Sequence, residues 1–198
     1  MRQIIAIHGA DSYETYAEFW QALADKILHF DRLKFSDWKN NLEEDLGDGY
    51  EVVLPRMPNP QNAKYEEWKL WFEKLIPHLA DEVIFVGHSM GGVFLAKYLS
   101  ENSFPKHVRA TFLVAPPFDE DGGRRLPEFA IANDLTGFAK QGGVIFLYQS
   151  MDDPVVNPIE IEKYQKLLPG AHIRMFSDRQ HFNQDHLPEL VDDIRALS

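Results

Sequence analysis

The chain has 198 residues, 44% of them hydrophobic and 26% charged, which predicts a single globular domain spanning residues 1–198 and excludes a disordered chain. Its formal net charge of −11 argues against a nucleic-acid partner, because binding phosphates requires clustered lysine and arginine. The chain has no cysteine, so disulfides, thiolate metal sites and a cysteine nucleophile are excluded.

The N-terminal segment MRQIIAIHG carries one basic residue and an apolar run too short for a signal peptide. No stretch of the chain reaches the roughly 18 apolar residues of a membrane span. We therefore expect a cytoplasmic protein with no membrane partner.

Short apolar runs alternate with segments of helical period along the chain. Each run is about five residues long, the length of a buried strand. This alternation predicts a three-layer α/β fold, a doubly wound parallel sheet of about six strands with helices on both faces. Ligands of such sheets bind at the carboxyl ends of the strands, so the residues that follow the runs are the candidates for a site. The expected strands are Gln3–Ile7, Glu51–Leu54, Glu82–Val86, Ala110–Val114, Val144–Tyr148 and His172–Phe176.

The segments between the runs carry the expected helices. Ser36 is the expected N-cap of a helix that ends at Gly47. Val93 and Phe94 begin the apolar face of a helix after a glycine-rich turn, and Pro188 stands in the first turn of the last helix. Two further apolar faces recur with helical period, formed by Tyr16, Phe19, Trp20, Leu23 and Ile27, and by Trp68, Trp71, Phe72 and Leu75.

The sequence GHSMG at residues 87–91 matches the pattern G-x-S-x-G, between a predicted strand and a predicted helix. A strand that becomes a helix within a residue or two forces Ser89 into a strained backbone conformation. Its neighbours two positions away then approach so closely that only glycine fits. Ser89 Oγ would stand clear at a helix N-terminus, which favours developing negative charge. We interpret Ser89 as a nucleophile; the alternative is a plain turn.

A serine nucleophile needs a base, and the base needs an orienting acid; in folds of this type the chain order is Ser, then Asp or Glu, then His. His181 follows the last predicted strand within a short loop and is the preferred base, whereas His186 is interpreted as a cap or surface residue. A metal site at these two histidines and Asp185 is not expected, because their spacing does not place both rings on one helix face and no third ligand is apparent.

Asp152 and Asp153 follow the preceding predicted strand and compete for the role of the acid. Asp153 is preferred, because Pro154 restricts its backbone and would hold its carboxylate in a fixed direction. The alternative reading of the acidic pair is an ordinary turn before a helix that starts near Pro158.

Two backbone N–H groups are candidates for an oxyanion hole. The Met90 N–H lies at the start of the helix after Ser89, and the Ala10 N–H lies in the loop after the first strand, where Gly9 lets the backbone approach closely. His8 is expected to be structural or to contact substrate. The alternative for this loop is a plain turn between strand and helix.

One connection departs from the regular alternation. Residues 116–143 are rich in glycine, proline and charge, and long connections of this kind often have a function. We expect either a pocket-lining role or a solvated crossover with one short helix. The candidate pocket walls are Trp20, Phe118, Phe182 and residues 126–138, although each of these aromatic residues also suits the core.

With Ser89, Asp153, His181 and His8-Gly9 in place, the chain resembles the α/β-hydrolase superfamily. More narrowly, it resembles the small lidless serine hydrolases of the YdeN type, which also include the retinoblastoma-binding serine hydrolase. The pieces that carry the resemblance run from IIAIHG through VGHSMGG and SMDDPVV to the HF after the last strand. In that family the acid of this motif is typically the second aspartate, which agrees with Asp153.

The resemblance implies a minimal α/β-hydrolase fold that lacks the two N-terminal strands of larger members, with six parallel strands in the order 2-1-3-4-5-6. The chain departs from better-known members by an extra helix within residues 30–49. The retinoblastoma-binding motif needs cysteine, which this chain lacks, so that partner role is not carried over.

These observations predict a serine hydrolase that cleaves small acyl esters through an acyl-enzyme intermediate, without a metal or an organic cofactor. The expected partner is a small-molecule ester or amide, and the expected state is a monomer or weak homodimer. The alternatives are a peptidase, thioesterase or C–C hydrolase on the same triad, and a non-enzymatic interaction protein that retains the fold.

Overall fold

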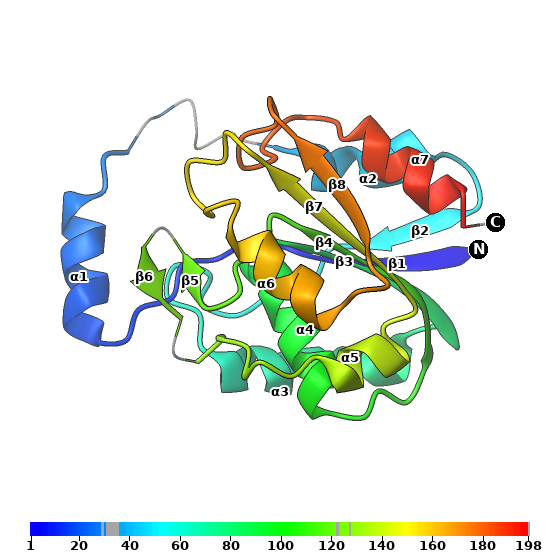
Figure 1. Ribbon diagram of the computed structural model, residues 1–198, viewed down its shortest axis with the longest axis horizontal. Helices are drawn as coiled ribbons and strands as arrows, with labels where there is room; N and C mark the ends of the chain where they lie inside the picture. The colour runs from blue at the N-terminus through cyan, green and yellow to red at the C-terminus, as the bar shows by residue number, and fades with distance from the viewer. Residues whose placement is uncertain (29, 31–35, 122, 127, 198) are drawn as a thin grey trace.

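The computed structural model describes residues 1–28, 30, 36–121, 123–126 and 128–197 (Figure 1). Its central sheet follows the order β2-β1-β3-β4-β7-β8, and each neighbouring pair is parallel. The predicted α/β class and the strand order implied by the resemblance are therefore confirmed. The strands are β1 (Arg2–Ile7), β2 (Tyr50–Val53), β3 (Glu82–His88), β4 (His107–Val114), β7 (Val144–Ser150) and β8 (His172–Phe176).

The central strands are apolar on both faces, because helices cover the sheet from both sides. Successive side chains of β1 alternate between two cores: Ile5 and Ile7 pack in one, and Ile4 and Ala6 in the other. This is why the strands are continuous apolar runs in the sequence rather than runs of alternating polarity.

Each face of the sheet carries its own group of helices (Figure 1). Trp68 and Phe72 anchor the larger core, and Trp38 and Leu42 anchor the smaller core. One face is covered by α3 (Tyr65–Leu75), α4 (Met90–Glu101), α5 (Thr136–Gln141) and α6 (Glu160–Leu167), and the other by α2 (Trp38–Leu46) and α7 (Pro188–Arg195). None of the helices in the described part of the chain has the length and apolarity that a membrane crossing needs.

The helix α1 (Tyr16–Asp25) lies apart from these layers, beyond the carboxyl ends of the strands (Figure 1). Thr15 and Glu18 form a capping box at its start, which explains why the helix begins there. None of its residues is buried, and Trp20 is 60% exposed. The apolar face predicted from the sequence is therefore present, but it is not buried against the rest of the described chain.

The helix α2 begins one residue later than its expected cap. The N-cap is Asp37 and not Ser36: the Asp37 side chain accepts a hydrogen bond from the Lys39 N–H, and the Asn40 side chain accepts one from the Asp37 N–H. Both residue types are good caps, so the sequence alone does not distinguish them. The predicted end of the helix at Gly47 is confirmed, with a φ of 76° that favours glycine.

The irregular connection at residues 116–143 contains a short hairpin, β5 (Glu120–Asp121) and β6 (Arg124–Arg125), followed by α5. Its apolar side chains belong to the larger core, where Phe129 and Leu135 are almost completely buried. The connection therefore covers α4 as part of the core.

Candidate active site

A pocket of about 550 Å³ opens at the carboxyl ends of the strands. Ser89, His88 and His181 line it together with Gly9 and Ala10. Two ion pairs flank these residues, Lys26 with Asp11 and Lys39 with Asp37. The structure thus brings the predicted nucleophile, the predicted base and the predicted oxyanion loop together in one concavity.

Ser89 occupies a strained turn between β3 and α4. Its φ of 53° and ψ of −122° lie outside the region that non-glycine residues favour, and its N–H donates to Val114 O at 2.8 Å. A Cβ on Gly87 would lie 2.6 Å from Gly91 O, and a Cβ on Gly91 would collide with the Ile7 carbonyl. The expected strain at the serine and the need for glycine on either side are confirmed.

Backbone N–H groups lie on two sides of Ser89. Met90 is the first residue of α4, so its N–H has no acceptor within the helix. The loop after β1 approaches so closely that a Cβ on Gly9 would lie 3.2 Å from Ser89 Cβ. Ala10 follows Gly9 on the wall of the same pocket.

His8 fixes this loop through both ring nitrogens. Its Nε2 accepts from the Met57 N–H at 3.0 Å, so Nδ1 carries the proton and donates to Gly9 O at 2.8 Å. Burial lowers the pKa of His8, which favours the neutral ring that this arrangement requires. His8 lines the pocket, and its polar atoms are used to hold the loop that carries Ala10.

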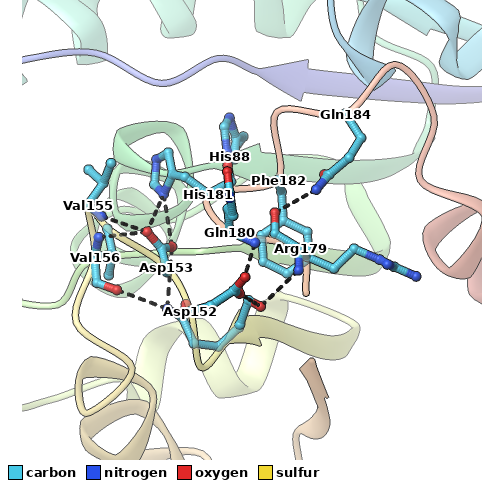
Figure 2. A network of polar contacts seen from close by, with 12 residues as sticks. His88, Asp152, Asp153, Val155, Val156, Arg179, Gln180, His181, Phe182 and Gln184 are labelled. Carbon is cyan, nitrogen blue, oxygen red and sulfur yellow. Dashed lines mark hydrogen bonds and ion pairs between the residues drawn. The ribbon is translucent and has the colours of Figure 1, made fainter. Parts of the chain in front are cut away.

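His181 and Asp153 form a close pair (Figure 2). The His181 Nδ1 lies 2.9 Å from Asp153 Oδ2 and 3.1 Å from Oδ1. The Asp153 side chain is fully buried, and its Oδ1 also accepts from the N–H groups of Val155 at 2.8 Å and Val156 at 3.0 Å. The carboxylate is thereby fixed in place, and because His181 Nδ1 donates to it, Nε2 is the nitrogen that can accept a proton.

Asp152 has a different position. It is exposed, and its Oδ1 accepts from Ser150 Oγ at 2.5 Å and from the Gln180 N–H at 3.0 Å. The Ser150 hydrogen bond holds the pKa of the Asp152 carboxyl below its usual value. Asp152 therefore fixes the turn beside His181, and Asp153 is the aspartate that contacts the imidazole.

Ser89 and His181 share the pocket without a hydrogen bond between them in the described part of the chain. Both residues are buried except for a small surface that faces the pocket. Hydrogen bonds of this kind often shorten only when substrate is bound.

The structure places His186 on the surface, where its ring pairs with Asp45 at 2.9 Å. That hydrogen bond raises the pKa of His186. The ring does not line the pocket, as expected for a surface residue. Among the described residues, no group of three histidine, cysteine, aspartate or glutamate side chains is arranged to hold a metal ion.

The three aromatic residues proposed as pocket walls do not line this pocket, and this expectation needs correction. Phe118 packs edge-on against Tyr164, and Phe182 packs against Phe176; both are buried in the cores. Trp20 is exposed on α1. The pocket is also not lined by any described residue between positions 116 and 143. The sequence around an aromatic residue that follows a strand does not show whether its ring lines a cleft or packs in the core.

Several residues that line the pocket were not predicted, among them Asp37 and Lys39 at the start of α2. The Lys39 Nζ lies 2.5 Å from Asp37 Oδ2 and 3.1 Å from His88 Nδ1. Burial lowers the pKa of Lys39 and, more strongly, that of His88. A lysine in the first turn of a polar helix gives no sequence signal that separates it from a solvated residue.

The chain is similar to known proteins at two levels, a family model and solved structures. A model of a family described as serine hydrolase matches residues 30–188. A search among curated protein sequences found no match.

The fold is similar to that of several solved hydrolase structures. The ydeN gene product of B. subtilis superposes with a TM-score of 0.70 at 18% identity, covering 100% of this chain and 98% of the other. A structure from work on carboxylesterases of the Thaumarchaeon Nitrososphaera gargenis gives 0.63 at 14% identity, covering 98% and 88%. A thioesterase domain from the curacin biosynthetic pathway gives 0.62 at 14% identity, covering 98% and 90%. At these identities the likeness shows a shared fold.

Proposed function

The chain belongs to the serine hydrolase family, with the fold of the small YdeN-like α/β-hydrolases, and on that premise we propose that it cleaves small acyl esters with a Ser89–His181–Asp153 triad. The observation that carries the proposal is the buried Asp153–His181 pair, which reaches the same pocket as the strained serine.

In the first step Ser89 Oγ attacks the acyl carbonyl, and its proton passes to His181 Nε2. Asp153 keeps the ring in the required tautomer, because it accepts the Nδ1 proton, and it stabilises the positive charge that develops. The imidazolium then gives its proton to the departing alcohol, which leaves an acyl group on Ser89. Water, activated by His181, releases the acid by the same steps in reverse.

The negative charge on the carbonyl oxygen is stabilised by the Met90 and Ala10 N–H groups. Met90 N–H lies at the positive end of α4, and Gly9 brings the Ala10 backbone close to Ser89. Loss of one such donor typically raises the barrier by about 3 to 4 kcal/mol. The two amides therefore supply a large share of the proposed catalysis.

The size and lining of the pocket support a short acyl group. Its volume of about 550 Å³ is in the lower half of the usual range for ligand sites, and among the described residues its apolar side chains are those of Ala10, Pro60 and Val155. Both lining lysines are paired with aspartates, which favours a neutral ester over an anionic one. We expect acetyl and propionyl esters to be cleaved faster than octanoyl esters.

The proposal is tested with a fluorophosphonate probe and a panel of p-nitrophenyl esters, acyl-CoAs and aminoacyl amides. The parent protein is expected to be labelled and to cleave the short esters fastest, and Ser89→Ala is expected to lose both properties. Labelling that survives this substitution would remove Ser89 from the role of nucleophile. Faster cleavage of acyl-CoAs or amides would change the substrate class and leave the triad in place.

A further inference from the structure

The helix α2 brings a buried cation to the pocket from the face of the sheet opposite α4 (Figure 1). The side chains of Lys39 and Asp37 are only 10% and 12% exposed. A buried ammonium is costly unless it is paired and hydrogen-bonded, and here its partners are the Asp37 carboxylate and His88. The triad chemistry described above makes no use of this pair.

The contacts of His88 fix its tautomer. Its Nε2 lies 2.9 Å from the His181 carbonyl oxygen, which can only accept, so Nε2 carries the proton. Its Nδ1 is then an acceptor, and it accepts a hydrogen bond from the Lys39 Nζ at 3.1 Å. A continuous series of hydrogen bonds therefore runs from Asp37 through Lys39 and His88 to the backbone of His181.

The loop that carries His181 needs such support. Gln180 and Phe182, on either side of it, have φ values of 48° and 52°, which non-glycine residues adopt only when their surroundings hold them there. Trp38 of α2 donates from its N–H to Gln184 O and from its Nε1 to Phe182 O, each at 2.8 Å. The start of α2 thus holds the carbonyls at 182 and 184 directly and the carbonyl at 181 through His88.

We propose that Lys39 is a positioning residue for the base: through His88 it fixes the backbone of His181 and thereby the aim of its imidazole at Ser89. The inference rests on the proposed function of His181. Without the Lys39 ammonium, the buried His88 Nδ1 loses its donor, and only the His181 carbonyl still holds the ring. The ring then shifts toward another donor, and the backbone of His181 moves with it.

The first experiment compares Lys39→Met with Lys97→Met. Lys97 is a matched control, because it is similarly buried, pairs with Glu101 at 2.9 Å and donates to Ala130 O at 3.1 Å, but does not line the pocket. We expect Lys39→Met to lower kcat about 10- to 100-fold with KM unchanged, the loss typical of a misplaced catalytic group. Lys97→Met is expected to lower the melting temperature and to leave kcat unchanged. An equal kcat for the two variants would overturn the proposal.

A second readout does not depend on turnover. In ¹⁵N NMR spectra the parent is expected to show His88 protonated at Nε2 and a slowly exchanging His181 Nδ1 proton. In Lys39→Met that proton is expected to exchange faster, while in Lys97→Met it stays as in the parent. If the parent neither cleaves esters nor reacts with the fluorophosphonate, the proposed function fails, and these spectra still decide the positioning role. An unchanged His181 signal in Lys39→Met would contradict it.

Variants of His88 test the same series of hydrogen bonds if the Lys39 variant does not fold. His88→Gln keeps a donor for the His181 carbonyl, and His88→Leu does not. With Lys39 intact, kcat is expected to be about fivefold higher in the glutamine variant, the factor that one retained hydrogen bond gives. Equal kcat values for these two variants would count against the series of hydrogen bonds.

Discussion

The turn at Ser89 and the loop around His181 lie on the same pocket, but they are built differently. The Ser89 turn depends on glycines within two positions of it, since Gly87 admits the backbone of Gly91 and Gly91 admits the carbonyl of Ile7. The His181 loop is fixed by residues distant in the sequence: Asp152 and Asp153 after β7, and Trp38 and Lys39 on α2. A locally determined turn can be recognised from a short motif, whereas a loop held from outside cannot. Substitutions can test this contrast.

The largest effect is expected at the base itself. His181→Ala should lower kcat by about 10⁴-fold or more, because Ser89 then has no proton acceptor. His186→Ala should leave kcat unchanged, since that ring pairs with Asp45 away from the pocket. Steady-state hydrolysis of p-nitrophenyl acetate measures both. The reverse pattern would mean that the base has been misassigned.

The next largest effect is the difference in kcat between substitutions of Asp153 and of Asp152. Asp153→Asn is expected to lower kcat by about 10³- to 10⁴-fold, because an amide no longer favours the tautomer with the proton on Nδ1. Asp152→Asn weakens the hydrogen bonds from Gln180 and Ser150 and should lower kcat about 10-fold or less. A larger loss in Asp152→Asn than in Asp153→Asn would exchange their roles.

Substitutions at the Ser89 turn and at the support of the His181 loop should lower the free energy of unfolding by different amounts. Gly87→Ala places a Cβ 2.6 Å from Gly91 O, and we expect it to destabilise the protein by about 3 kcal/mol. Trp38→Phe removes one hydrogen bond to the Phe182 carbonyl and should cost about 1 kcal/mol. Urea unfolding monitored by circular dichroism gives both values. A larger cost for Trp38→Phe would show that the loop, and not the turn, is the more sensitive of the two.

The smallest effect concerns the surface contact between α2 and the segment before α7. The hydrogen bond from the His186 ring to the Asp45 carboxylate raises the pKa of His186 above its ordinary value. The contribution of this contact to stability is therefore fully present below the ordinary histidine pKa and is lost as the pH rises through the raised one. The difference in melting temperature between the parent and His186→Gln should shrink over that interval. A difference that grows with rising pH would contradict the pairing.

The sequence predicted those parts of the molecule whose causes are local. The strands follow from continuous apolar runs, and the turn at Ser89 follows from glycine at positions 87 and 91. Asp153 was preferred over Asp152 because Pro154 follows it, and in the structure Asp153 is the aspartate that contacts His181. In each case the determining residues lie within a few positions of the feature they explain.

What the sequence did not predict depends on placement in space. Trp20 and Trp38 both stand on helices, but the first is 60% exposed and the second 1%. From the sequence, Lys39 is indistinguishable from a solvated helix residue. In the structure, α2 places it in the pocket beside His88. Phe118 and Phe182 were candidates for pocket walls, but both are buried in the cores. The sequence does not distinguish these two placements of an aromatic residue.

The central claim is that Ser89, His181 and Asp153 act as one unit at the carboxyl edge of the sheet. The most direct test is a crystal structure of the protein after reaction with a fluorophosphonate. The account predicts phosphorus on Ser89 Oγ, the phosphonyl oxygen on the Met90 and Ala10 N–H groups, and His181 Nε2 within about 3 Å of the ester oxygen. Phosphorus on another residue, or His181 turned away from the phosphonate, would contradict it.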